Sequence, residues 1–278
     1  MKTFILLLVM TIVQPVTLLI VALLSSVSTE AYILPLDTIL SKTVTGTTEQ
    51  AGNTIIAVEQ NVVFTEGDQE YIIKESWLIE GDKNLKLNAV GKGALKDLFS
   101  LHYLYNNKKR THLEGKNKIV KEISPEFFER FLAIKSADSY RSYLKQQGIF
   151  SRVRLSRAAG AISFAIGDAS SLATLSPQIW INQDFFHLSK IRFRSEADVE
   201  FSDYKHYGKE NAIQYPSSKV INWGVDRTAT VKVVKFSTKS GASIKDFYTD
   251  ALDTPSEMFL IDKGSLENKV REFYTRFR

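Results

Sequence analysis

The sequence contains no cysteine and only four histidines among its 278 residues. The lack of cysteine excludes disulfides, thiol catalysis and thiolate metal sites, and also the acylated cysteine of a bacterial lipoprotein. The nearest approach to a metal-binding pair is His112 with Glu114, which share a face if they lie on a strand. One histidine and one glutamate do not complete a coordination shell. We therefore expect no metal and no other cofactor.

The common catalytic fingerprints are missing as well. The sequence has no G-x-S-x-G, P-loop or Rossmann motif, and the segment 91–97 lacks the P-loop spacing. Ser202, Asp203 and His206 are close along the chain, but closeness in sequence does not make a catalytic triad. We expect a protein that is not an enzyme, with a hydrolase as the remaining catalytic alternative.

Long apolar runs are confined to the beginning of the chain. Residues 4–24 are apolar apart from four positions, and Lys2 is the only charged residue before Glu30. A lysine ahead of an apolar run, followed by small residues, is typical of a secretory signal. We expect residues 1–29 to be a signal peptide and the mature protein to be periplasmic. The run is long enough to cross a bilayer, so an uncleaved inner-membrane anchor is the alternative.

The rest of the sequence predicts one globular domain. The chain is 44% apolar and 24% charged, which is ordinary for a soluble fold, and no linker rich in proline, glycine or serine divides it. We expect a single domain over residues 30–278. Ser124-Pro125 indicates the start of a helical insertion at 124–147, and C-terminal helices are predicted within 243–278.

Strand patterns dominate the remainder. Apolar residues alternate over 54–64, 70–81 and 85–89, which predicts an antiparallel meander with one buried face. The hairpin predicted at 177–193 is apolar on both faces, which indicates a second layer or a cavity beside it. Similar patterns recur to residue 237.

The positive charge is concentrated in one sector. The chain carries a net charge of +5, but residues 108–157 hold thirteen lysines and arginines against five acidic residues. Such a sector predicts contact with an anionic membrane surface, and a solvated face is the alternative. The export signal argues against nucleic acid as a partner. The candidate surface residues are Lys108, Lys109, Arg110, Arg141 and Lys145.

Two segments carry a resemblance to a known family. They are ESWLIEGDKNLKLNAVG at 75–91 and the stretch 175–223, which contains Trp180-Ile181, a dense turn at 182–184 and FSDY at 201–204. With Pro216 ahead of the next strand, residues 50–237 resemble the Lol lipoprotein-carrier superfamily of bacterial envelope proteins. The resemblance implies an α+β fold, a curled antiparallel half-barrel of about eleven strands with helices lidding its concave face.

The resemblance also implies a function. A concave face that holds acyl chains indicates a non-catalytic periplasmic carrier or binding protein for lipid or acylated protein, acting at the envelope membrane surface. The alternative is an envelope protein-interaction or assembly module with a filled cavity and a protein partner. If the inward side chains line a cavity, Trp77→Ala and Phe131→Ala should reduce binding at little cost in stability. The candidate cavity residues are Val58, Val62, Ile73, Trp77, Leu87, Phe127 and Phe131.

Overall fold

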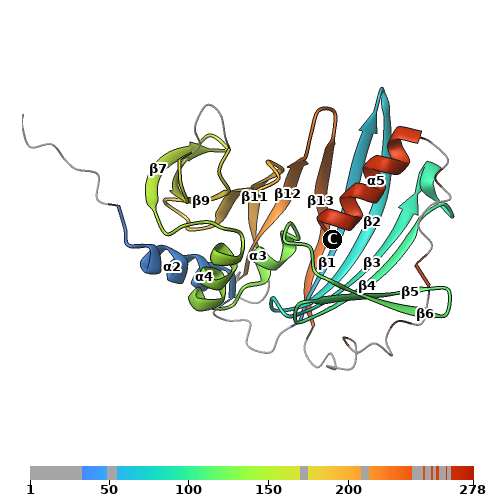
Figure 1. Ribbon diagram of the computed structural model, residues 1–278, viewed down its shortest axis with the longest axis horizontal. Helices are drawn as coiled ribbons and strands as arrows, with labels where there is room; N and C mark the ends of the chain where they lie inside the picture. Colours follow the sequence, from blue (N-terminus) through green and yellow to red (C-terminus); the bar gives the residue numbers. More distant parts are fainter. Residues whose placement is uncertain are drawn as a thin grey trace, which may run out of the picture. The chain divides into compact units, whose positions relative to one another are not determined.

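The computed structural model describes residues 33–48, 55–169, 175–207, 213–239, 247, 252, 255–256, 261 and 264–278. The predicted signal peptide and most of the helix predicted near residue 243 lie outside these residues. From Pro35 onward the described chain forms one compact unit, whose thirteen strands and four α-helices are shown in Figure 1.

All thirteen described strands belong to one antiparallel sheet. Its order is β6-β5-β4-β3-β2-β1-β13-β12-β11-β10-β9-β8-β7, so the first and last strands of the sequence are hydrogen-bonded neighbours in the middle. The strands are β1 (Ile55–Glu66), β2 (Gln69–Glu80), β3 (Asn84–Lys92), β4 (Ser100–Asn106), β5 (Lys109–Glu114), β6 (Asn117–Glu122), β7 (Val153–Ala158), β8 (Ala161–Ile166), β9 (Gln178–Asn182), β10 (Leu188–Arg192), β11 (Asp198–Tyr207), β12 (Ile213–Asn222) and β13 (Thr228–Lys239).

The predicted class, an α+β fold with a curled antiparallel sheet, is confirmed, but the number of strands is thirteen rather than eleven. The eleven strands are what the resemblance implies; alternation along the sequence predicts about twelve, and the strand it missed is β5. Its residues Arg110, Thr111 and His112 are buried in succession, so the strand shows no apolar alternation.

The long strands β1 to β3 bury the face that their alternation predicts. Val58 of β1 pairs with Trp77 of β2, and Trp77 pairs in turn with Leu87 of β3, so the three side chains form one row across the sheet. Val62 and Ile73 form a second row on the same face. Each of these side chains is buried.

The hairpin at 177–193 is apolar on both faces because protein side chains cover both faces of its first strand, β9. All five residues of β9 are buried. Trp180 packs in a small cluster with Ala158 and Ala165 on neighbouring strands, and the Arg192 guanidinium lies 5.2 Å from its ring centroid. Trp180 therefore covers much of this face of β9 itself, against two alanines and the Arg192 guanidinium.

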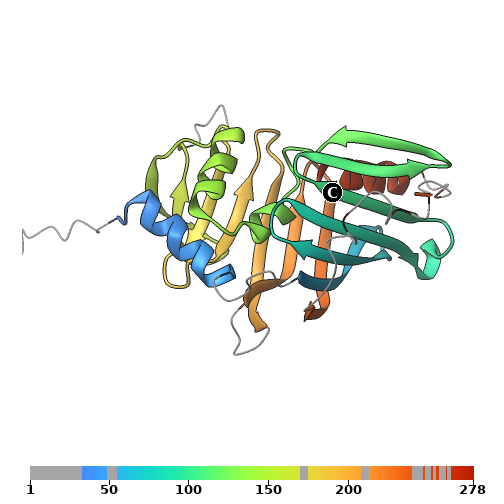
Figure 2. The same cartoon turned by 90° about the horizontal axis from the view of Figure 1, so that it is seen from below.

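The helices are α2 (Leu36–Thr48), α3 (Glu129–Ala133), α4 (Ala137–Gln146) and α5 (Gly264–Arg276). In Figures 1 and 2, α5 lies over the concave side of the sheet, and α2 and α4 lie side by side. Phe64 of β1 contacts Phe273 of α5 edge to face, with ring centroids 5.3 Å apart. None of the helices within the described residues is both long enough and apolar enough to cross a bilayer.

Local sequence determines where the helices of the insertion begin and end. Ser136 caps α4 by accepting a hydrogen bond from the Ser139 amide at 3.1 Å, and Gly148 follows the helix with a positive φ of 71°. Ser124 accepts from the Glu126 amide, but the turn it caps does not continue directly, and α3 begins only at Glu129.

Candidate ligand-binding cleft

A buried ionic cluster fills the middle of the concave face. Glu75, Glu129, Lys219 and Arg278 are each 0% exposed and contribute two charges of each sign. Arg278 donates to both oxygens of Glu75, at 2.8 and 3.1 Å. The Lys219 ammonium lies 2.9 Å from a Glu129 oxygen. Every charge therefore has an opposite partner, which such burial requires.

Neutral side chains complete this cluster. Gln60 donates to Glu75 at 2.7 Å and accepts from Lys219 at 2.9 Å, while Tyr215 donates to Glu129 at 2.9 Å. Burial on its own would raise the pKa of Glu129, but Lys219 and Arg278 outweigh that effect and hold it below its usual value. The sequence gives one indication of this cluster: Gln60 and Glu75 are polar residues at the inward, otherwise apolar positions of β1 and β2.

The seven predicted cavity residues are all buried, at 0–3% exposure. Trp77 stacks on Tyr105 and Phe127, each with a centroid separation of 5.9 Å, and the Arg278 guanidinium lies 5.7 Å from its ring. Phe131 instead packs against Tyr140 and Tyr143 of α4. These contacts fill the space around Trp77 and Phe131, so the two aromatic side chains belong to close-packed core.

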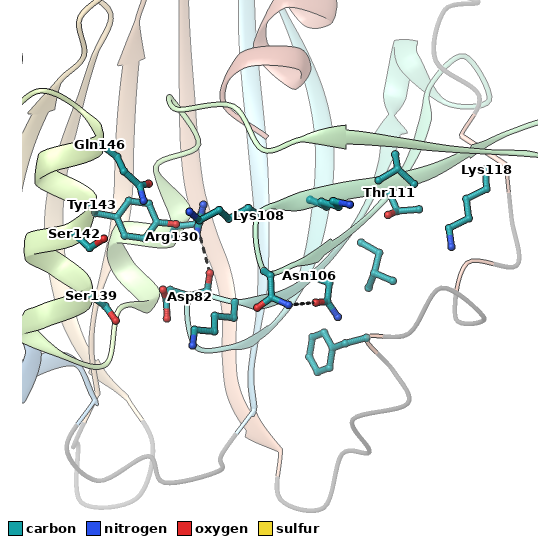
Figure 3. Close-up of a pocket in the computed structure, with 16 residues that line it drawn as sticks. Asp82, Asn106, Lys108, Thr111, Lys118, Arg130, Ser139, Ser142, Tyr143 and Gln146 are labelled. Atoms are coloured by element: carbon teal, nitrogen blue, oxygen red, sulfur yellow. Dashed lines mark hydrogen bonds between the residues drawn. The ribbon is translucent and has the colours of Figure 1, made fainter.

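A cleft of about 820 Å³ opens beside this core, between α4 and strands β4 to β6. Figure 3 shows α4 as one wall and the strands as the other, with Arg130 between them. The lining combines apolar side chains with a basic and polar rim. The apolar lining residues are Leu104, Val120, Tyr143 and Phe247, and the charged ones are Asp82, Lys83, Lys108, Lys109, Lys118 and Arg130.

Two hairpin turns bring the basic residues together at one end of the sheet. Lys83 lies in the turn between β2 and β3, and Lys108 lies in the turn between β4 and β5. The turns are joined by a hydrogen bond from the Asn107 amide to the Lys83 carbonyl at 2.8 Å. Antiparallel strands β3 and β4 return the chain to the same edge, so residues 25 positions apart in the sequence become neighbours.

The predicted membrane-surface residues do not form one group. Lys108 and Lys109 line the cleft. Arg141 pairs with Asp37 and Asp138 at the surface, and Lys145 borders a different, smaller pocket beside α4.

Arg110 lies elsewhere and corrects the prediction for that residue. It is only 4% exposed and donates to the carbonyls of Tyr274 and Thr275 at the end of α5. A guanidinium held there satisfies orphan helix carbonyls and does not face a membrane.

Two solved structures have a fold similar to that of this chain. A LolA superfamily protein from Nitrosomonas europaea aligns with a TM-score of 0.56 and 10% sequence identity, over 79% of this chain and 100% of that chain. This chain has the fold of the LolA superfamily. An outer membrane lipoprotein-sorting protein domain from Vibrio parahaemolyticus aligns at 0.52 and 13% identity, over 78% of this chain and 97% of that chain. No protein-family model and no curated protein matches the sequence. The predicted resemblance is thus confirmed for the fold.

Proposed function

We propose that the protein is a non-catalytic carrier or binding protein for lipid or acylated protein of the bacterial envelope. The observation that carries the proposal is the cleft between α4 and β4–β6, which joins an apolar floor to a basic rim on a LolA-type fold. Its volume of about 820 Å³ lies within the range of roughly 300–1,000 Å³ typical of small-molecule sites. The ligand's acyl chain would lie on Leu104, Val120 and Tyr143.

The test is binding of a phospholipid that carries an environment-sensitive dye on its acyl chain. Ser142→Trp narrows the cleft from α4, and Val120→Glu places a charge on its floor; both positions are exposed, so the fold should survive. Matched controls are Ser202→Trp and Val234→Glu, which are exposed positions on β11 and β13 outside the lining. We expect the cleft variants to lose most of the dye signal and the controls to keep it. Equal binding by all four variants would contradict the site.

A second candidate function is an envelope protein-interaction module. The filled space around Trp77 and the buried ionic cluster favour it, because a close-packed concave face offers an acyl chain no room there. In this case the dye-labelled lipid should not bind wild-type protein at all, whereas a protein partner should co-purify with it.

We further propose that residues 30–278 form the mature periplasmic domain and that residues 1–29 direct export. N-terminal sequencing of the protein from its own host should find a start near residue 30 in the soluble envelope fraction. An intact Met1 in the membrane fraction would show that the apolar run is an anchor.

A further inference from the structure

Arg130 enters the cleft from α3, while its neighbour Glu129 enters the buried ionic cluster. The Arg130 Nε donates to the main-chain oxygen of Asp82 at 3.2 Å, and its guanidinium carbon lies 4.2 Å from the centroid of the Tyr143 ring. It forms no ion pair with any carboxylate of the described residues. A guanidinium has five N–H donors, and toward the described residues only Nε–H of Arg130 is seen to donate, which leaves the others for a ligand.

The surroundings of Arg130 are strongly positive. Among the described residues, four lysines line the same cleft and Asp82 is the one acidic lining residue. Within the described part of the chain, none of these lysines takes part in a salt bridge. A concave site lined by charges of one sign attracts an ion of the opposite sign. The four lysines are Lys83, Lys108, Lys109 and Lys118.

The position of Arg130 also has an energetic cost that an anion would offset. Partial burial lowers the pKa of Arg130 to about 10, because burial disfavours the charged form. The side chain stays protonated at neutral pH, and the nearby negative charge of Asp82 offsets only part of the effect of burial. The hydroxyl of Tyr143 is buried nearby and finds no hydrogen-bond partner among the described residues. Arginine binds phosphate oxygens through paired N–H groups, and these are among the stronger hydrogen bonds in proteins.

We infer that Arg130, with Lys83 and Lys108, binds the phosphoryl headgroup of an anionic phospholipid whose acyl chains lie on the apolar floor of the cleft. Leu104, Val120 and Phe247 line the same cleft, so it presents apolar as well as cationic side chains and matches an amphiphile rather than a free anion. This inference rests on the proposed function and adds the headgroup chemistry and the residues that recognise it.

The experiment compares two dye-labelled lipids with identical acyl chains, phosphatidylglycerol and uncharged diacylglycerol. Wild-type protein should bind phosphatidylglycerol about tenfold or more tightly, since a hydrogen bond to a charged group contributes about 1.5–3 kcal/mol. Arg130→Gln should abolish the preference and leave diacylglycerol binding intact. Lys108→Gln, in an exposed turn, should reduce the preference, while Lys116→Gln, in the exposed turn between β5 and β6, should not.

Each outcome separates the inference from the function on which it rests. Equal affinity of wild type for the two lipids overturns the headgroup assignment and leaves the carrier proposal standing. Binding of neither lipid overturns both. Inorganic phosphate or glycerol phosphate serves as a third probe, and we expect neither to displace bound phosphatidylglycerol at millimolar concentration. If inorganic phosphate displaced bound phosphatidylglycerol, the cleft would be a site for free anions, and the assignment to lipid would be overturned.

Discussion

Arg278 donates from Nε and Nη2 to the two carboxylate oxygens of Glu75, across 203 positions of the sequence. Trp77 donates to the same carboxylate at 3.0 Å. The pair connects the end of α5 to the middle of β2 and lies in the space that the sequence assigned to a ligand. This ionic contact, rather than an acyl chain, occupies the centre of the concave face.

Removing one member of this pair should destabilise the fold strongly. Arg278→Met leaves the Glu75 carboxylate buried without its cation, and we expect the free energy of unfolding to fall by about 3–5 kcal/mol. Urea denaturation measures the loss. The double variant Glu75→Met with Arg278→Met should recover part of it, because no unpaired charge remains. A single variant as stable as wild type would show that Glu75 and Arg278 do not form a buried pair.

Acid should weaken the same cluster through Glu129. The pKa of Glu129 is lower in the folded protein than its usual 4.5, so the unfolded chain takes up the proton first as pH falls. The resulting stability is complete above about pH 4.5 and is lost as pH falls through the folded pKa. Glu129→Gln should therefore show a shallower fall in unfolding free energy between pH 5 and 3, although it is less stable at pH 7. If the unfolding free energies of wild type and Glu129→Gln fell with the same slope between pH 5 and 3, Glu129 would not be the group responsible.

His187 should make a second, separate contribution to pH dependence. Its ring stacks on Tyr204 with a centroid separation of 3.9 Å, and burial lowers its pKa from 6.5 to about 4. The unfolded chain binds the proton more readily, so stability should fall as pH drops from 6.5 to 4, by about 1–2 kcal/mol after allowance for solvent screening of this partly exposed ring. His187→Phe keeps the stack and removes this dependence. An NMR titration midpoint near 6.5 instead of 4 would refute the prediction.

Truncation of the predicted cavity residues should lower the stability of the fold. Trp77 and Phe131 are closely packed, so Trp77→Ala and Phe131→Ala should each lower the unfolding free energy by about 3–5 kcal/mol. The sequence predicted a smaller loss, on the expectation of a cavity. Thermal and urea denaturation decide between the two. Ser142→Trp is the contrasting variant, because it should alter binding with little change in stability.

Much of the sheet could be predicted because strand alternation is strict where one face is buried. The inward positions Val58, Trp77 and Leu87 follow from that pattern, and Leu266, Val270 and Phe273 of α5 follow from helical spacing in the same way. The strand β5 did not follow, because its buried residues are polar.

The cleft and the ionic cluster could not be read from sequence spacing. Arg130 meets Lys108 and Lys83 only after the insertion folds against two hairpin turns, and Glu75 meets Arg278 only when α5 covers the sheet. Such contacts depend on tertiary packing between distant segments. The basic sector at 108–157 contains Arg130 and three of the cleft lysines, but the charge pattern assigned Arg130 no role and placed the buried Arg110 at the surface.

The most direct test of the cleft as a lipid site is native mass spectrometry of the protein purified from its own host. We predict one bound phospholipid per chain in wild-type protein, absent from Ser142→Trp and retained in Ser202→Trp. Repeated absence of lipid from wild type, together with a stable protein partner, would contradict the account and favour the interaction module.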